Sequence, residues 1–403
     1  MPSIDKMTRP ELIRDLKVAR EAAAKARKAA AASKAEAKQT ERKSKTEIPA
    51  ELELLRSEVR SLKRRERLEG GVQALIVSTA KMALADWDGK VLLPPPIKFR
   101  HPKEEVVAVA HLTDIQLGKK TETYCTEIAE GRMLEYARKA AACCAVHNKS
   151  RGISELHVYL GGDMVEGDGT IFPKQQFSID SSVLEQAIIN GPRIFSAVLL
   201  YWSRYFKKIV VKCVRGNHGR SGKKHDDGHP YTNWDTAFYL CTKQMTEKLL
   251  AENDIAPDKC SIEWDIGQSW YVVDEVLGHK NLIIHGDVGI KGSLGFPWYG
   301  TQKRMAGWLD AVPEAWDHLY LGHFHQYVSY DWNNHMVFAG GTPESGNEFA
   351  RSELAATGRP KQRLQLWTAR NGPIVDLPIF LNYGYDKRQP YSQKRRSVEP
   401  GAA

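Results

Sequence analysis

The chain has 403 residues, of which 42% are hydrophobic, and it carries a formal net charge of +9 at pH 7. This hydrophobic content is ample for one large core or two smaller ones. No apolar run approaches the length of a membrane span, and the N-terminus lacks the apolar core of a signal peptide. The six cysteines show no CxxC spacing, which favours reduced, buried thiols. The sequence therefore predicts a cytoplasmic protein with no membrane segment.

The positive charge is concentrated at the two ends of the chain. Residues 1–70 contain 19 Lys and Arg against 12 Asp and Glu, and residues 387–403 contain five against one. Residues 71–386 are nearly neutral, with 34 basic and 36 acidic groups. Basic ends suit a polyanion such as nucleic acid, which is the partner we predict, although such tails are also common as solvated ends.

The N-terminal quarter of the chain predicts helices followed by a linker. A capping box at Thr8-Arg9-Pro10-Glu11 opens a basic, Ala- and Lys-rich helical arm over residues 1–46, which has no apolar face to bury. Residues 47–103 contain a further helical segment and a Pro-rich linker. Leucines at helical spacing in this segment are compatible with self-association or with packing back on the core.

Residues 104–386 predict a single α/β domain, followed by a basic tail at 387–403. Strands and helices alternate up to about residue 252, a βαβαβ pattern that implies parallel pairing and right-handed crossovers. Beyond Cys260 the strands are closely spaced, and a helix near 300–311 interrupts them. One parallel half and one mixed half indicate two sheets packed face to face, with helices outside.

Five apolar runs of this domain end in polar residues that suit metal or phosphate chemistry. The strand 209–214 stops at Gly216 and delivers Asn217 and His218 to its carboxyl end, where open α/β sheets place their ligands. The other four runs, near residues 107–112, 156–160, 282–285 and 319–321, likewise end in Asp, Gln or His, usually beside a Gly. Together these ends supply Asp114, Gln116, Asp163, Asn217, His218, His285, His323 and His325.

Oxygen donors mixed with imidazoles suit Mn²⁺, which we predict, with Fe²⁺, Zn²⁺ and Mg²⁺ as alternatives. The absence of cysteine from the set argues against a structural zinc site. The candidates outnumber the ligands of one ion, so we expect two ions, which could clamp a phosphoryl group and activate a water. His323 and His325 stand at i and i+2, which on a strand would place both on one face.

The five motifs resemble, in order, those of the calcineurin-like metallophosphoesterase superfamily over roughly residues 105–345. They read 114-Asp-Ile-Gln-116, 162-Gly-Asp-163, 216-Gly-Asn-His-218, a single His285, and 322-Gly-His-Phe-His-325. The resemblance implies a four-layer α/β/β/α sandwich, here with an N-terminal helical extension. In layout the chain is similar to SbcD-type repair nucleases and to metallophosphoesterases found in bacteriophage genomes.

The resemblance also implies a role for each motif residue. The first metal would be held by Asp114, Gln116 and His325, with Asp163 as the bridge to the second. The second would be held by Asn217, His285 and His323. His218 would not bind metal but would touch the phosphate, either stabilising charge or protonating the leaving oxygen.

Two residues depart from the family pattern. Gln116 stands where a His is usual, which favours Mn²⁺ over Zn²⁺ at the first site; alternatively, Gln116 only hydrogen-bonds a bound water. Gly219 stands where relatives often carry an acidic residue that orients the catalytic His. We predict Asp235 as its substitute, with Asp226 and Asp227 as weaker candidates. Glu166 is interpreted as a loop residue, with support of the metal site as the lesser alternative.

The substrate is predicted from charge. Arg220, Lys223 and Lys224 directly follow His218 and could bind the phosphates that flank a scissile bond, although a solvated charge run is the alternative. With the basic ends, they favour a phosphodiester in nucleic acid, and hence a nuclease or DNA-processing enzyme. The alternatives are a phosphatase or phosphodiesterase acting on a nucleotide or phosphoprotein, and a non-catalytic scaffold that binds polyanions.

Overall fold

The computed structural model describes residues 105–148, 152–169, 175–222, 232–290, 295–346 and 358–384, together with Glu21, Lys25 and Arg27. The chain divides into two units, Met1–Leu75 and Ile76–Ala403. In the first unit the three described residues are helical and exposed. The rest of the predicted arm at 1–46, the segment at 47–103 and the tail at 387–403 lie outside the described residues. Among the described helices, none has the length and apolar character needed to cross a membrane.

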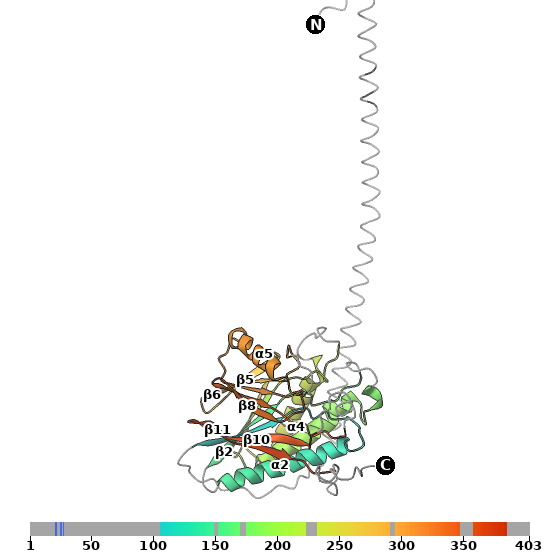
Figure 1. The fold of residues 1–403 in the computed structure, drawn as a ribbon. Coiled ribbons are helices and arrows are strands. Elements are labelled where there is room, and N and C mark those ends of the chain that lie inside the picture. The colour runs from blue at the N-terminus through green and yellow to red at the C-terminus, as the bar shows by residue number, and fades with distance from the viewer. Residues whose placement is uncertain are drawn as a thin grey trace, which may run out of the picture. The chain divides into compact units, whose positions relative to one another are not determined.

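The first sheet contains strands from both halves of the domain (Figure 1). Its order is β11 (Gly372–Phe380), β10 (Lys361–Thr368), β1 (Val106–Leu112), β2 (Ile153–Leu160), β3 (Lys208–Cys213) and β4 (Ser261–Ile266). The strands β1 to β4 are parallel, whereas β10 pairs antiparallel with both β1 and β11. The division into one parallel and one mixed half therefore needs correction, because β4, β10 and β11 from the second half extend the first sheet.

The second sheet has the order β5 (Tyr271–Val276), β6 (His279–Ile284), β7 (His318–Leu321), β9 (His335–Ala339) and β8 (Val328–Trp332). The pairs β6–β7 and β7–β9 are parallel, while β5 and β8 pair antiparallel with their neighbours. The main helices are α2 (Thr126–Asn148), α3 (Gly191–Trp202), α4 (Trp234–Glu252) and α5 (Trp298–Ala311). A 3-10 turn, η2 (Gln175–Phe177), and a π-helical turn, η3 (Glu185–Asn190), precede α3.

The apolar residues gather in three clusters that follow from this arrangement. Strand β1 is buried along its whole length, and its side chains alternate between two clusters. Ala108 and Ala110 join the cluster that contains residues of α2, α3 and α4, whereas Val107 and Val109 face Tyr320 and other residues of the second sheet. The third cluster joins the second sheet to α5. The two sheets therefore meet through one core, and burial on both sides explains the continuous hydrophobic run in β1.

Candidate metal centre

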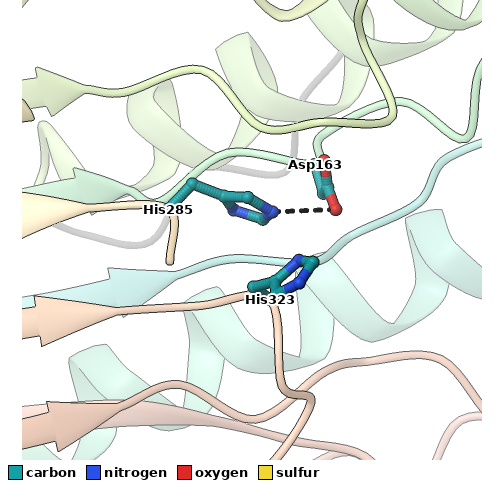
Figure 2. A group of neighbouring side chains, drawn as sticks. All are labelled: Asp163, His285 and His323. Atoms are coloured by element: carbon teal, nitrogen blue, oxygen red, sulfur yellow. Dashed lines mark ion pairs between the residues drawn. The ribbon is translucent and has the colours of Figure 1, made fainter. Parts of the chain in front are cut away.

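The predicted site residues lie where strands of both sheets end. Asp114 follows β1, Asp163 follows β2, and Asn217 and His218 follow β3. From the second sheet, His285 follows β6, and the two histidines of the last motif follow β7. Asp163, His285 and His323 point toward one another across the two sheets (Figure 2). The carboxyl ends of strands from two sheets thus bring together side chains that lie up to about two hundred residues apart in the sequence.

The turns that present these side chains have an uncommon backbone conformation. Asp114, Gln116, Asp163, His323 and His325 have φ of 54°, 47°, 51°, 67° and 55°. Residues other than glycine rarely adopt this left-handed conformation, and it persists where the surrounding structure enforces it, often at functional sites. The expectation that His323 and His325 share a strand face is wrong, since β7 ends at Leu321 and both histidines belong to the loop that follows.

The loops of the site are fixed to one another by hydrogen bonds. The amide nitrogen of His323 donates to both oxygens of Asp114, at 3.0 and 2.9 Å, and so connects the last motif to the first. The amide nitrogen of His218 donates to Oδ1 of Asp163 at 2.8 Å. Gly216 is required here, because a Cβ atom at this position would lie 2.1 Å from Oδ1 of Asp163. This glycine lets the two loops approach closely enough to align Asp163 with the loop after β3.

One group of donor atoms has the composition and spacing of a metal site. The donors of Asp163, His285 and His323 lie within 4.8 Å of one another, and no other trio of His, Cys, Asp or Glu does so in the described parts of the chain. Nε2 of His285 is 2.9 Å from Oδ2 of Asp163 and 3.1 Å from Oδ1 of Asn217. Nδ1 of His285 faces the carbonyl of Gly161 at 2.8 Å, which directs Nε2 toward the site.

The electrostatics of this group reflect its burial. Asp163 and His285 are each 1% exposed. Burial opposes a charged imidazole, but the neighbouring carboxylate of Asp163 outweighs it and raises the pKa of His285 to about 10. Burial and the neighbouring His285 lower the pKa of His323 to about 4. Buried nitrogen and oxygen donors of this kind fit a divalent ion, which would also offset the negative charge of Asp163.

The donors expected at the first metal site also lie close together, but one of them is engaged elsewhere. Nε2 of His325 is 3.3 Å from Oδ1 of Asp114. Gln116 directs its amide nitrogen to Nε2 of His325 at 3.3 Å and to Nε2 of His218 at 3.4 Å. Its amide oxygen, the atom that would bind a metal, accepts a hydrogen bond of 3.1 Å from Nζ of Lys119. Nε2 of His325 thus faces both Asp114 and the amide nitrogen of Gln116, and the oxygen of Gln116 is open to a metal only once it leaves Lys119.

His218 lies beside the metal donors. Its Nδ1 is 3.1 Å from the carbonyl oxygen of Glu166 and 3.3 Å from Oε2 of that residue. Its Nε2 lies 4.0 Å from Oδ2 of Asp163. Although burial opposes it, the carboxylates of Asp163 and Glu166 raise the pKa of His218 to about 9. The side chain is thus held from its Nδ1 side, and Nε2 faces the metal donors.

The carboxylate that contacts His218 is that of Glu166, although the sequence favours only a loop role for this residue. Asp235, predicted as the orienting residue, directs both carboxylate oxygens to backbone amides instead. It accepts from the nitrogens of Asp163 at 2.9 Å, Met164 at 3.0 Å and Gly216 at 2.8 Å. These contacts assign it the task of joining the loops after β2 and β3 to the first turn of α4. A catalytic role for Asp235 stays a prediction.

The absence of a side chain at Gly219 also has a local reason. A Cβ atom there would lie 2.4 Å from Oδ1 of Asn233 and 2.9 Å from the amide nitrogen of Asp235. Asn233 is the N-cap of α4, where its side chain accepts from that same amide. The start of α4 therefore occupies the space that an acidic side chain at position 219 would need.

The predicted substrate contacts are only partly described. Arg220 forms an ion pair with Asp287, and the two side chains are 10% and 9% exposed. This pair connects the loop after β3 to the loop after β6, and a phosphate contact by Arg220 stays a prediction. Lys223 and Lys224, like Asp226 and Asp227, lie outside the described residues.

Two residues near Gln116 and His325 have no place in the five motifs, Lys119 and Glu344. Nζ of Lys119 is 3.1 Å from Oε1 of Glu344, and Oε2 of Glu344 is 3.4 Å from Nδ1 of His325. Their sequence contexts give little signal, because Lys119 follows a turn-like motif and Glu344 belongs to a Gly-rich loop.

Comparisons with known proteins give structural similarities alone. No protein-family model matches the sequence, and no curated protein does so either. An archaeal phosphodiesterase is 11% identical, covers 68% of this chain and 99% of its own, and has a TM-score of 0.29. Hypothetical protein PH1004 from Pyrococcus horikoshii OT3 is 13% identical, covers 72% and 93%, and has a TM-score of 0.35. YfcE, a phosphoesterase from E. coli, is 12% identical, covers 68% and 99%, and has a TM-score of 0.26. These values are too low to assign a function, which must come from the site itself.

Proposed function

We propose that the chain is a metal-dependent phosphodiesterase of the calcineurin-like superfamily that binds two divalent ions, with Mn²⁺ preferred. The observation that carries this proposal is the convergence of Asp163, Asn217, His285 and His323 beside Asp114 and His325, with His218 next to them. The three apolar clusters support a four-layer α/β/β/α arrangement. An N-terminal helical extension, the SbcD-like or bacteriophage subtype and a cytoplasmic location belong to the same proposal.

The chain's own residues divide the chemistry between them. Divalent ions held by these donors would supply the Lewis-acid charge that polarises a phosphoryl group and makes water a better nucleophile. Asp163 contacts Nε2 of His285 through one oxygen and the amide of His218 through the other, while His285 is fixed by the carbonyl of Gly161. His218, held through Nδ1 by Glu166, would donate a proton from Nε2 to the leaving oxygen as the bond from phosphorus breaks. The oxygen of the attacking water would bond to phosphorus and release its proton to solvent, while the bond from phosphorus to the leaving oxygen breaks and that oxygen takes the proton of His218.

A phosphodiester in nucleic acid is the substrate that we favour. The basic ends of the chain, with 19 Lys and Arg in residues 1–70 and five in residues 387–403, support a polyanionic substrate. The second candidate is a phosphatase or phosphodiesterase for a nucleotide or phosphoprotein, which the nearly neutral residues 71–386 favour. Both candidates use the same metal centre, so substrate size distinguishes them.

The test compares substrates on the Mn²⁺-loaded full chain. End-labelled single-stranded and duplex DNA are incubated alongside bis-p-nitrophenyl phosphate and p-nitrophenyl phosphate, with His218→Ala as the control for contaminating nuclease. We expect cleavage of DNA and of the small diester, both lowered by about 10²–10⁴ in the variant. Hydrolysis of the small esters alone would support the second candidate. No hydrolysis with Mn²⁺, Fe²⁺, Zn²⁺ or Mg²⁺ would contradict the enzyme assignment and leave a non-catalytic scaffold.

A further inference from the structure

A lysine that belongs to none of the five sequence motifs lies beside the donors expected to hold the first metal ion, which are Asp114, Gln116 and His325. Nζ of Lys119 is 3.1 Å from Oε1 of Gln116, 3.1 Å from Oε1 of Glu344 and 3.7 Å from Oε1 of Glu166. The side chain is 14% exposed, while those of Glu166 and Glu344 are 4% and 1% exposed. The ammonium group is therefore held among three oxygen atoms from three different loops, much as a metal ion would be.

The reason for this arrangement lies in the two glutamates. Glu166 and Glu344 add two buried carboxylates to a site that already contains Asp114 and Asp163. Buried carboxylates without a counter-charge are costly, and an ammonium group between them offsets that cost. The same ammonium binds the amide oxygen of Gln116, and Glu344 also contacts Nδ1 of His325. Lys119 is thus connected to two of the three residues expected to hold the first ion.

We propose that the ammonium of Lys119 is a built-in cation that competes with the divalent ion at Asp114, Gln116 and His325. This inference rests on the two-ion site of the proposed function. The oxygen of Gln116 cannot serve Lys119 and a metal with the same lone pairs and direction, and a fixed positive charge repels a divalent ion nearby. The group at Asp163, Asn217, His285 and His323 has no described contact with Lys119. The two ions therefore bind in order. The tight ion binds at Asp163, Asn217, His285 and His323, and the weak ion binds beside Lys119 at the donors expected for the first site.

Metal binding without substrate tests the inference. The metal-stripped full chain is titrated with Mn²⁺, and free Mn²⁺ is followed by electron paramagnetic resonance alongside isothermal calorimetry. We expect a tight and a weak ion whose dissociation constants differ by at least about tenfold, since one nearby unit charge at an effective dielectric constant of about 20 contributes that much or more. Lys119→Gln should tighten the weak ion by at least about tenfold and leave the tight ion unchanged.

Three further variants separate charge from structure. Lys119→Arg keeps the charge and should keep the weak ion weak, while Lys119→Met is a second neutral variant, and thermal melting identifies any variant that fails to fold. Lys120→Gln is the matched control, because Lys120 is the neighbouring lysine and is exposed. If folded Lys119→Gln and Lys119→Met both leave the weak ion unchanged, or if Lys120→Gln tightens it equally, Lys119 is only a structural counter-ion.

The titration also distinguishes this inference from the proposed function. Two equally tight ions in the unaltered chain would overturn the inference and leave the phosphodiesterase assignment intact. A weak ion that tightens in Lys119→Gln would support the inference even if no phosphoester were hydrolysed. A single ion in the unaltered chain, joined by a second in Lys119→Gln, would be its strongest support.

Discussion

His218 and Asp163 lie next to each other, yet their contacts assign them different tasks. Asp163 directs one oxygen to His285 and the other to the amide of His218, so its loss removes a donor and loosens two loops. The His218 side chain is held by Glu166 and lies beside the donors without joining the group at Asp163, His285 and His323.

We therefore expect His218→Ala to keep bound Mn²⁺ and to lower turnover of a small phosphodiester by about 10²–10⁴. Asp163→Ala should lose the metal. Equal metal loss in both variants, measured by atomic spectroscopy, would show that the roles are wrongly assigned.

Glu166 provides a second test at the residue scale. Its carboxylate contacts Nδ1 of His218, and together with Asp163 it raises the pKa of that imidazole. Glu166→Gln should lower turnover by about 10- to 100-fold, the usual effect of removing a residue that orients a catalytic group. Asp168→Asn, in the same loop but exposed, is the matched control and should stay near the unaltered rate. Similar rates for the two variants would remove Glu166 from the mechanism.

The sequence predicts which motif residues converge at this edge, but it does not predict the residues that contact them. Each motif residue directly follows an apolar run, and the carboxyl ends of such runs meet at one edge. Glu166, Lys119 and Glu344 lie in irregular loops, where no periodicity indicates which way a side chain points. Asp235 is predicted to orient His218 from the start of its helix, but the sequence does not distinguish a contact with an imidazole from the contacts with backbone amides that the structure shows.

At the scale of elements, the loop that carries Glu166 depends on an irregular helix. The turn η3 is π-helical, and its Gln186 is fully buried. Oε1 of Gln186 accepts from the amide of Gly167 at 3.0 Å, and Nε2 donates to the carbonyl of Gly167 at 3.1 Å. A π-helical turn is a local expansion often found at functional sites. Side-chain periodicity over residues 182–206 does not reveal a single widened turn, so the sequence alone does not indicate it.

The two sheets are joined by a buried polar contact whose strength depends on pH. His157 of β2 lies between Asp274 of β5, at 2.5 Å from Nδ1, and Glu155, at 3.0 Å from Nε2. Burial opposes a charged imidazole, but these carboxylates outweigh it and raise the pKa of His157. A group whose folded pKa is raised stabilises the fold fully below its unfolded pKa of about 6.5. That contribution is lost as the pH rises through the folded pKa.

We therefore expect the stability advantage of the unaltered chain over His157→Gln to be largest near pH 6 and to shrink toward pH 9. At pH 6 it should reach about 3 kcal/mol, the scale of breaking a buried ion pair. Urea unfolding followed by circular dichroism at several pH values measures the difference, with His147→Gln of α2 as the control. A difference that stays constant between pH 6 and 9 would show that His157 is not charged in the folded chain.

At the scale of the whole molecule, sheet membership was the part of the fold that the sequence could not supply. The sequence predicts closely spaced strands beyond Cys260, the part of the chain that contains β4, β10 and β11. Which sheet each strand joins depends on pairings such as Val109 with Gln365, which are separated by more than two hundred residues. Local sequence encodes the pleat and the burial of a strand, but it does not encode a distant partner.

The distribution of charge over the whole chain leads to the last prediction. Deleting residues 1–70 and 387–403 removes 24 of the 58 Lys and Arg and leaves every proposed metal donor in place. Hydrolysis of a small phosphodiester should survive, because it requires only the metal centre. Binding to DNA should weaken and its salt dependence should flatten, since each lost phosphate contact removes about 0.9 from the slope of log K against log salt. Fluorescence anisotropy with labelled duplex and single-stranded DNA between about 50 and 200 mM salt measures both.

If the truncated chain keeps the affinity and slope of the full chain, the basic ends do not bind nucleic acid. The contact would then fall to the loop from Arg220 to Lys224, or the substrate would be smaller than a polynucleotide.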